Sequence, residues 1–145
     1  MMRILGIDYG EARVGIAISD ALNITAQGLE TIQRNNSDKV VLRRLDEIFE
    51  EYEVDTIVVG MPLNMNGTIS ERAKITEQFI HKLKCKYNKM KISTVDERLT
   101  TVEAHKTMNF LDVNKNKKKN IVDTISAVYI LETYLNKLKN TLKND

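Results

Sequence analysis

The sequence is poor in the residues that mark disulfide-rich, metal-thiolate and membrane proteins. It has one cysteine, two histidines, one proline and no tryptophan. Cys85 cannot close an internal disulfide and lies in a polar helical stretch, so we expect a passive thiol in a reducing compartment. No apolar run approaches the roughly 18 residues of a membrane span, and the amino-terminal residues resemble a strand more than a signal peptide. These absences predict a cytoplasmic protein without a membrane partner.

Length and composition are those of a single globular domain over residues 1–145. Hydrophobic residues make up 42% and charged residues 29% of the chain, which is enough for one substantial core. The net charge of +2 favours no class of partner. Lysines gather in two clusters, which suit either a polyanion partner or a solvated surface. The clusters are Lys115, Lys117, Lys118 and Lys119, and Lys82, Lys84, Lys86, Lys89 and Lys91.

The amino-terminal third has the pattern of three antiparallel strands. Residues 2–9 and 13–19 are apolar runs separated by a short turn that contains Gly10, which predicts a hairpin. Residues 26–33 form a third candidate strand beside the second. Asn35, Asn36 and Ser37 then precede apolar residues at helical spacing, so we expect a helix that ends near Tyr52.

The middle of the chain alternates between strands and helices. Residues 55–60 are apolar and β-branched, as in a strand buried on both faces of a parallel sheet. Thr68 and Glu71 have the spacing of a capping box and predict a helix through about Lys86. Residues 91–95 form a last strand, which the paired acids Asp96 and Glu97 follow directly.

The carboxyl-terminal third is predicted to be helical around one loop. Thr100 and Glu103 repeat the capping-box spacing and predict a short helix to about residue 109. Residues 112–120 are polar and lysine-rich without periodicity, so we expect a mobile loop. Asn120 would then cap the last helix, with Asp123 in its first turn and an apolar stripe through residues 122–142.

This order of elements predicts an α/β fold with one five-stranded mixed sheet, strand order 3-2-1-4-5, flanked by helices. Right-handed crossovers place the last two strands parallel to the first. Four acids then lie at one edge of the sheet, where open α/β sheets bind ligands. Asp8 ends the first strand, Asp96 and Glu97 end the last, and Asp123 lies on the inner face of the final helix with Ala127.

Carboxylates that converge at one edge repel each other unless a cation joins them. Oxygen ligands without His or Cys favour Mg²⁺ or Mn²⁺, which can activate a water for phosphodiester hydrolysis. Each acid also has a structural alternative. Asp123 can stabilise the helix dipole, the acids after the last strand can pair with Arg98 or Arg13, and Asp8 can accept bonds from amides of its turn.

A series of motifs spread over nearly the whole chain resembles the YqgF family, the Holliday-junction-resolvase-like proteins. The motifs are Gly6-Ile7-Asp8-Tyr9-Gly10, Arg13-Val14-Gly15-Ile16-Ala17, Ser19-Asp20, Val59-Gly60-Met61-Pro62-Leu63 with Gly67, Asp96-Glu97-Arg98, and Asp123-Thr124-Ile125-Ser126-Ala127. The first motif alone is also typical of actin-like kinases and ATPases. The ordered series is much more specific.

The resemblance implies a ribonuclease-H-like fold and a metal-dependent nuclease. Members are described as nucleases that mature the 5′ end of pre-16S rRNA, and earlier as junction resolvases. By matched motif, Asp8, Glu97 and Asp123 are the expected catalytic and metal-binding acids. We favour Glu97 over Asp96 because its longer side chain reaches further from the outer strand, although Asp96 stays a candidate ligand. Resolvases also carry an acid on the strand that matches residues 56–60, which this chain lacks.

Further residues are candidates for binding nucleic acid. Arg13 can contact a phosphate or hold one of the acids, and Arg98 can contact a phosphate or neutralise Asp96. The segment from Asn64 to Ser70 is rich in hydrogen-bond donors, among them Thr68, and leads into a helix N-terminus, which is either a natural phosphate site or merely a capped turn. The remaining candidates are Arg72, Lys115, Lys117, Lys118 and Lys119.

Three functions stay open at this point. The first is a nuclease that acts on pre-rRNA, the second a resolvase that acts on branched DNA, and the third a non-catalytic module that binds structured RNA. Paired symmetric cuts would require a dimer. The sequence contains no legible interface, and we expect a monomer or a weak homodimer.

Overall fold

A computed structural model of the chain describes residues 2–97 and 115–143, and within these the side chains of 2–97 and 122–141. Its strands and helices follow the predicted order closely. They are β1 (Arg3–Tyr9), β2 (Arg13–Ser19), β3 (Ala26–Gln33), α1 (Asp38–Glu51), β4 (Val54–Met61), α2 (Glu71–Lys86), β5 (Lys91–Asp96) and α4 (Lys115–Lys143).

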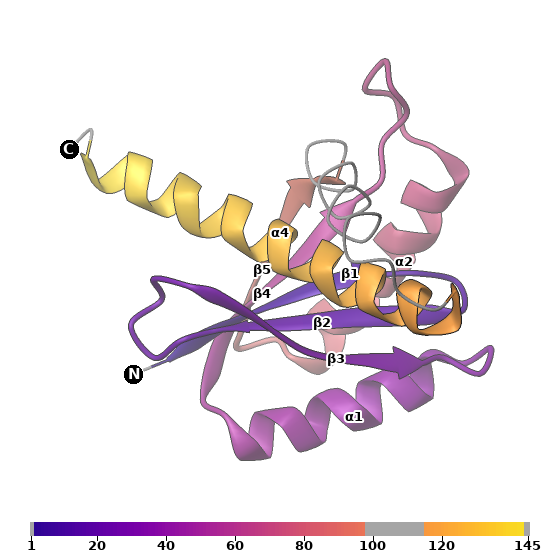
Figure 1. Cartoon of the computed structure of the whole chain (residues 1–145), viewed down its shortest axis with the longest axis horizontal. Helices are drawn as coiled ribbons and strands as arrows, with labels where there is room; N and C mark the ends of the chain where they lie inside the picture. The colour runs from indigo at the N-terminus through magenta and orange to yellow at the C-terminus, as the bar shows by residue number, and fades with distance from the viewer. Residues whose placement is uncertain (1, 98–114, 144–145) are drawn as a thin grey trace.

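The strands form one five-stranded sheet in the order β3-β2-β1-β4-β5, as predicted (Figure 1). β2 is antiparallel to both β1 and β3, whereas β4 is parallel to β1 and to β5. The carboxyl ends of β1, β4 and β5 therefore lie at the same edge. This arrangement brings Asp8 and the acids that follow β5 to one end of the sheet.

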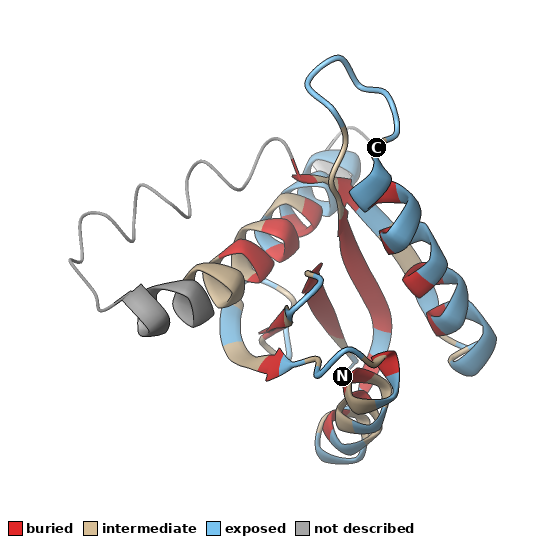
Figure 2. Ribbon diagram, turned by 90° about the vertical axis from the view of Figure 1, so that its right-hand side faces the viewer, coloured by how far each residue is buried: buried red, intermediate tan, exposed pale blue. Residues whose placement is uncertain are grey.

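Helices cover both faces of the sheet, and a separate apolar cluster lies under each cover. α1 and α2 pack on one face, where Leu45 and Phe79 are fully buried. α4 crosses the other face, where Ile130 and Leu131 are fully buried. In Figure 2 the buried residues lie on the strands and on the sheet-facing sides of the helices. Alternating residues of β1 consequently face two different cores.

The β1–β2 hairpin closes through a tight turn, as predicted. The amide of Gly10 donates to the carbonyl oxygen of Arg13 at 2.9 Å. A Cβ atom at position 10 would lie 2.5 Å from that oxygen, so this turn requires glycine. The turn fixes Arg13 at the start of β2, next to the end of β1.

The predicted start of α1 is confirmed, but the predicted cap of α2 is wrong. Ser37 caps α1 by accepting from the amide of Lys39. α2 is capped by Ser70, whose hydroxyl accepts from the amide of Ala73 at 3.0 Å, and not by Thr68. Thr68 instead binds within the preceding loop. Ser70 also donates to the carbonyl oxygen of Pro62, which ties the start of α2 to the end of β4.

The buried carboxylate of Asp38 joins α1 to β1 and to α2. Asp38 accepts hydrogen bonds from Tyr9 at 2.5 Å, from Arg34 at 2.8 Å and from Lys82 at 2.7 Å. Burial raises the pKa of Asp38, but the three donors outweigh it and the net direction is downward. Tyr9 also stacks on Phe79 with ring centroids 4.2 Å apart. The end of β1 is therefore held firmly against α1 and α2.

The carboxyl-terminal helix begins earlier than predicted. α4 starts at Lys115, so the loop expected up to residue 120 is wrong from position 115 onward. The expected cap at Asn120 is also wrong, because Asn120 lies inside the helix. Asp123 is well inside the helix, and the first turn of α4 carries no acid. The helix-dipole explanation for Asp123 therefore fails. The predicted apolar stripe is also only partly buried, since Leu138 lies 37% exposed beyond the sheet.

Two further observations bear on the predictions from composition. Cys85 is exposed, and its Sγ lies 3.6 Å from Nε2 of His81, one helical turn earlier in α2. Across the described helices, none is both long and apolar enough to cross a membrane. The predicted helix at residues 100–109 lies outside the described residues.

Candidate active site

Asp8 lies on the face of the sheet that α4 covers. It pairs with Gly15 of β2, and its neighbours Ile7 and Tyr9 point to the opposite core. Residues directly opposite each other on antiparallel strands point to the same face. Asp8 is only 8% exposed, so its carboxyl group is placed under α4 and away from bulk water.

Glu97 reaches Asp8 from the far side of β4. It directly follows β5 and is 7% exposed. Gly60 of β4 lies between the two acids, and a Cβ atom there would lie 3.5 Å from Cδ of Glu97. The carboxyl group of Glu97 therefore lies against Gly60, while the space left by the missing side chain of Gly60 is filled by Ile130 of α4.

Asp8 and Glu97 form a hydrogen-bonded pair of carboxyl groups. Two carboxyl groups can share a hydrogen bond only when one of them carries a proton. Burial is the largest cause that raises the pKa of Asp8 well above 3.8, followed by the hydrogen bond to Glu97 and the charges of Glu97 and Asp123, while Arg72 acts in the opposite direction. Ionising both acids of this pair is therefore unfavourable, and a cation beside them would stabilise the two negative charges.

Asp123 is brought to this pair by the close approach of α4 to β2. A Cβ atom at Gly15 would lie 2.0 Å from the carbonyl oxygen of Asp123, so only glycine permits this contact. Gly15 is the register partner of Asp8. The absence of one side chain consequently lets the helix backbone settle next to the acid pair.

Asp123 is held by Arg13, which lies 110 positions earlier in the chain. Nε of Arg13 donates to Oδ2 of Asp123 at 2.8 Å. The side chain of Arg13 is 28% exposed and that of Asp123 is 22% exposed. Burial raises the pKa of Asp123, and Arg13 opposes that effect. Of the two alternatives for Arg13, the structure shows the one in which it holds an acid of the predicted site.

Asp96 is placed differently from the other three acids. Side chains of a strand alternate between faces, and Val95 packs in the core under α4. Asp96 therefore belongs to the opposite face and Glu97 to the face of Asp8. This placement favours Glu97 over Asp96 as the partner of Asp8.

The acids do not form a closed metal cluster in this arrangement. Within residues 2–97 and 115–143, no group of three His, Cys, Asp or Glu side chains surrounds a single point. Asp8 and Glu97 interact directly. Asp123 interacts with Asp8 electrostatically, and its Oδ2 atom is paired with Arg13. The arrangement therefore combines two neighbouring acids, Asp8 and Glu97, with the nearby Asp123, whose carboxylate is paired with Arg13.

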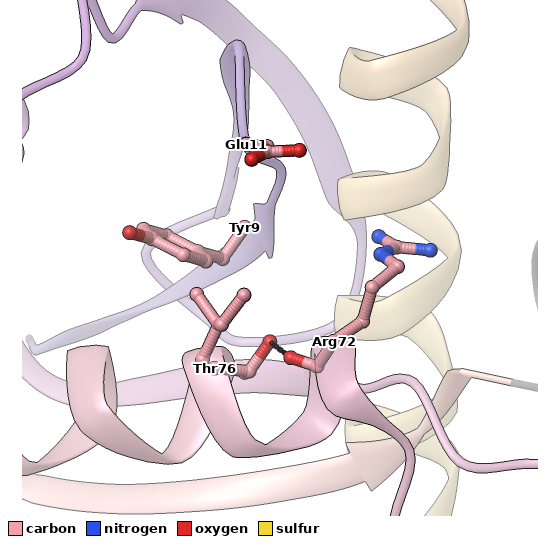
Figure 3. A pocket seen from close by; sticks show the side chains of 5 residues that line it. Tyr9, Glu11, Arg72 and Thr76 are labelled. Carbon is pink, nitrogen blue, oxygen red and sulfur yellow. Dashed lines mark hydrogen bonds between the residues drawn. The ribbon is translucent and has the colours of Figure 1, made fainter.

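Arg72 is the described basic residue that faces this site from α2. Its charge lowers the pKa of both Asp8 and Asp123, although its side chain is exposed. In Figure 3 its guanidinium group points away from α2 and along the neighbouring helix. A cation at this position can neutralise an anionic ligand that approaches the acids.

The predicted loop residues lie apart from the acids and bond mainly to each other. Asn64 donates to Thr68 at 3.0 Å, and Thr68 donates to Asn66 at 2.7 Å. These side chains are exposed in the segment that projects from the sheet between β4 and α2 (Figure 1). Their hydrogen bonds give the loop a defined shape without placing it against Asp8.

The remaining predicted residues cannot be placed at the level of side chains. Arg98 lies outside the described residues. The four lysines at positions 115, 117, 118 and 119 belong to the beginning of α4, and only the backbone is described there. Sequence reasoning missed Gly15 and Gly60 as residues that build the site. Both stand in the motifs quoted above, but their close contacts come from Asp123 and Ile130 of α4, which are distant in sequence.

Comparison with known proteins gives a consistent family. Residues 2–137 match the family described as "RuvX: Holliday junction resolvase". A protein of Ruminiclostridium cellulolyticum named "Putative pre-16S rRNA nuclease" is 52% identical over 143 residues, which is 99% of this chain and 100% of that protein. A protein of Acetivibrio thermocellus with the same name is 51% identical and covers 92% of this chain and 95% of its own length.

Solved structures with low identity share the fold. The fowlpox virus Holliday junction resolvase superposes with a TM-score of 0.59 at 16% identity, covering 94% of this chain and 99% of its own. RuvC of Thermus thermophilus in complex with a Holliday junction substrate gives 0.57 at 10% identity, with 96% and 97% covered. The fold is therefore ribonuclease-H-like, as the resemblance implied. By its sequence match and its relatives, the chain belongs to the RuvX (YqgF) family.

Proposed function

We propose that this protein is a metal-dependent nuclease that hydrolyses phosphodiester bonds of pre-16S rRNA during maturation of its 5′ end. One observation carries the proposal. Asp8 and Glu97 are two buried acids that raise the pKa of Asp8 between them, and the carboxylate of Asp123 is held nearby by Arg13. Buried acids in contact are costly unless a cation or a function compensates for them.

The donor set fits Mg²⁺ or Mn²⁺. All candidate ligands are carboxylate oxygens, which these hard cations prefer. A divalent cation would offset the repulsion between the acids and allow both groups to ionise. Asp8, Glu97 and Asp123 would hold it, with Asp96 as a further candidate. When bound, the ion would supply an activated water and stabilise developing charge on the phosphate.

The residues of the chain would bind and orient the substrate around this centre. Arg72 would hold a backbone phosphate near Asp8, and Arg13 would contact a phosphate once Asp123 has a cation as its partner. The reaction adds water across one P–O bond, so the new oxygen bonds to phosphorus while the nucleoside oxygen leaves and gains a proton. Arg98, Asn64, Thr68 and the lysines at the start of α4 would contact the nucleic acid further from the cleaved bond.

The substrate assignment rests on the relatives named above. A substrate among ribosomal RNA precursors would place the enzyme in the cytoplasm. One domain over residues 1–145 would be sufficient for this activity.

The test is cleavage of a precursor 16S rRNA fragment with Mg²⁺ or Mn²⁺. We expect Asp8→Asn, Glu97→Gln and Asp123→Asn each to lower the rate by about 100-fold or more, since even residues outside the ligand shell contribute 10- to 100-fold at metal sites. Glu50→Gln is the matched control, because Glu50 is exposed on α1. Equal rates for wild type and Asp8→Asn would exclude the catalytic assignment.

Two other functions make different predictions. The family description favours a resolvase, which would cut a four-way DNA junction symmetrically as a dimer and leave the rRNA fragment intact. We expect a monomer or weak homodimer by sedimentation, and no paired cuts. A non-catalytic RNA-binding module would bind the fragment but show no Mn²⁺ heat by calorimetry, in wild type and in Asp123→Asn alike.

A further inference from the structure

A small pocket lies directly beside the candidate active site. Tyr9, Glu11, Arg72, Ile75 and Thr76 line it, with a volume of about 60 Å³. It opens between the β1–β2 turn and the start of α2 (Figure 3). Tyr9 and Asp8 point to opposite faces of the sheet, but Arg72 lines the pocket and its charge also acts on Asp8 and Asp123, so a ligand in this pocket can share that guanidinium group with a phosphate at the acids. We call it the Tyr9 pocket.

The Tyr9 pocket combines opposite charges at its rim with an apolar floor. In Figure 3 the ring of Tyr9 and the guanidinium of Arg72 lie on opposite sides of the pocket, with the carboxylate of Glu11 above them and Thr76 on α2 below. Within the described residues, neither charged group forms an ion pair. The side chain of Ile75 is 43% exposed at this opening. A ligand for this pocket needs a negative group, a hydrogen-bond donor and a modest apolar surface.

The shape of the Tyr9 pocket favours a sugar over a stacked base. Tyr9 is only 5% exposed, and its ring already stacks on Phe79. Its hydroxyl group is committed to Asp38 at 2.5 Å. The ring therefore presents little surface for a base, whereas a ribose needs only shallow apolar contact and an acceptor for a hydroxyl.

We propose that the Tyr9 pocket binds the ribose of a nucleotide next to the cleaved phosphate, with Arg72 on a backbone phosphate and Glu11 accepting a hydrogen bond from the 2′-hydroxyl. The 2′-hydroxyl is the group that distinguishes RNA from DNA at a given site. DNA would leave Glu11 without a donor and close to the phosphate backbone. Glu11 is therefore the residue that selects RNA. This inference rests on the proposed nuclease function, which places a phosphate beside Asp8.

The test compares binding of two short single strands with the same sequence, one RNA and one DNA. Binding to the full-length wild-type protein is measured by fluorescence anisotropy in EDTA, so that no cleavage occurs. We expect RNA to bind about tenfold more tightly, the effect of one hydrogen bond to a charged group. Glu11→Ala abolishes this ratio, whereas Glu11→Gln keeps part of it because its amide oxygen still accepts.

Two further variants separate sugar recognition from general attraction. Arg72→Ala weakens RNA and DNA equally and keeps their ratio, since a phosphate contact is blind to the sugar. Glu50→Ala changes neither affinity nor ratio. Equal affinity of wild type for RNA and DNA, or an unchanged ratio in Glu11→Ala, overturns the proposal. A preference for RNA that vanishes when one nucleotide lacks its base also overturns it, because that nucleotide still carries its ribose.

The two proposals fail separately. A protein that cuts the rRNA fragment with Mn²⁺ but binds RNA and DNA equally in EDTA keeps the nuclease function and loses the role of the Tyr9 pocket. A protein that keeps the Glu11-dependent ratio but never cuts loses the nuclease function.

Discussion

Gly15→Ala is the substitution that tests most sharply how α4 delivers Asp123 to the site. A Cβ atom at position 15 would lie 2.0 Å from the carbonyl oxygen of Asp123, 2.4 Å from its carbonyl carbon and 3.1 Å from the amide nitrogen of Thr124. Contacts under 3.0 Å essentially never occur for real Cβ atoms, so the two backbones must separate by at least 3.0 − 2.0 = 1.0 Å. No rotation of a side chain can relieve this contact.

The expected cost follows from the kind of atom that is displaced. Overpacking of a core costs about 1–3 kcal/mol, and a helix backbone places Gly15→Ala at the upper end, about 3 kcal/mol. The loss of glycine entropy in the unfolded chain returns about 0.4–1 kcal/mol, which leaves a net loss of about 2 kcal/mol. A shift of 1 Å at a catalytic group can also cost about 100-fold in rate.

Gly60→Ala is the matched comparison. Its new Cβ atom would meet Cδ1 of Ile130 at 2.5 Å, which is the far end of a flexible side chain. We therefore expect a smaller loss of about 1 kcal/mol or less. Urea unfolding followed by far-ultraviolet circular dichroism measures both, since the chain has no tryptophan for fluorescence. A Gly15→Ala protein as stable as wild type, or more stable than Gly60→Ala, would refute the close approach of α4.

Three further predictions use the same unfolding assay. Because the pKa of Asp8 is raised in the folded protein, its contribution to stability is full below the unfolded value near 3.8 and is lost as pH rises through the folded value. The stability difference between wild type and Asp8→Asn should therefore fall over that range, and a flat difference would contradict the raised pKa. Ser70→Ala should cost about 1 kcal/mol through loss of the α2 cap while Thr68→Ala costs less, and the reverse order would restore the cap predicted from sequence. Asp38→Ala should cost about 3 kcal/mol, because it strands three hydrogen-bond donors around a buried site, and a neutral effect would show that they find other partners.

The order and direction of the strands could be predicted from the sequence because their patterns are local. The centre of β4 is an apolar run from Ile57 to Val59, as expected for a strand buried on both faces, and the Gly10 turn fixes the hairpin. Right-handed crossovers then leave few alternatives for the sheet. The convergence of Asp8 and Glu97 at one edge follows from this topology.

The start of α4 and the contacts of Asp123 could not be predicted in the same way. The lysine-rich segment has no apolar period, yet lysine is a good helix former and no glycine or proline interrupts the segment from Lys115. The ion pair between Arg13 and Asp123 joins residues 110 positions apart. The roles of Gly15 and Gly60 depend on what packs against them, which no local pattern records.

Calorimetric titration with Mn²⁺ tests the central claim most directly, because it asks whether the buried acids bind a cation at all. We predict a single saturable binding event for wild type, loss of that event in Asp8→Asn and in Asp123→Asn, and unchanged binding in Glu50→Gln. Binding should also release a proton, seen as a heat that depends on the buffer, since Asp8 must ionise to become a ligand. Absence of binding in wild type, or equal binding in wild type and Asp8→Asn, would contradict the account.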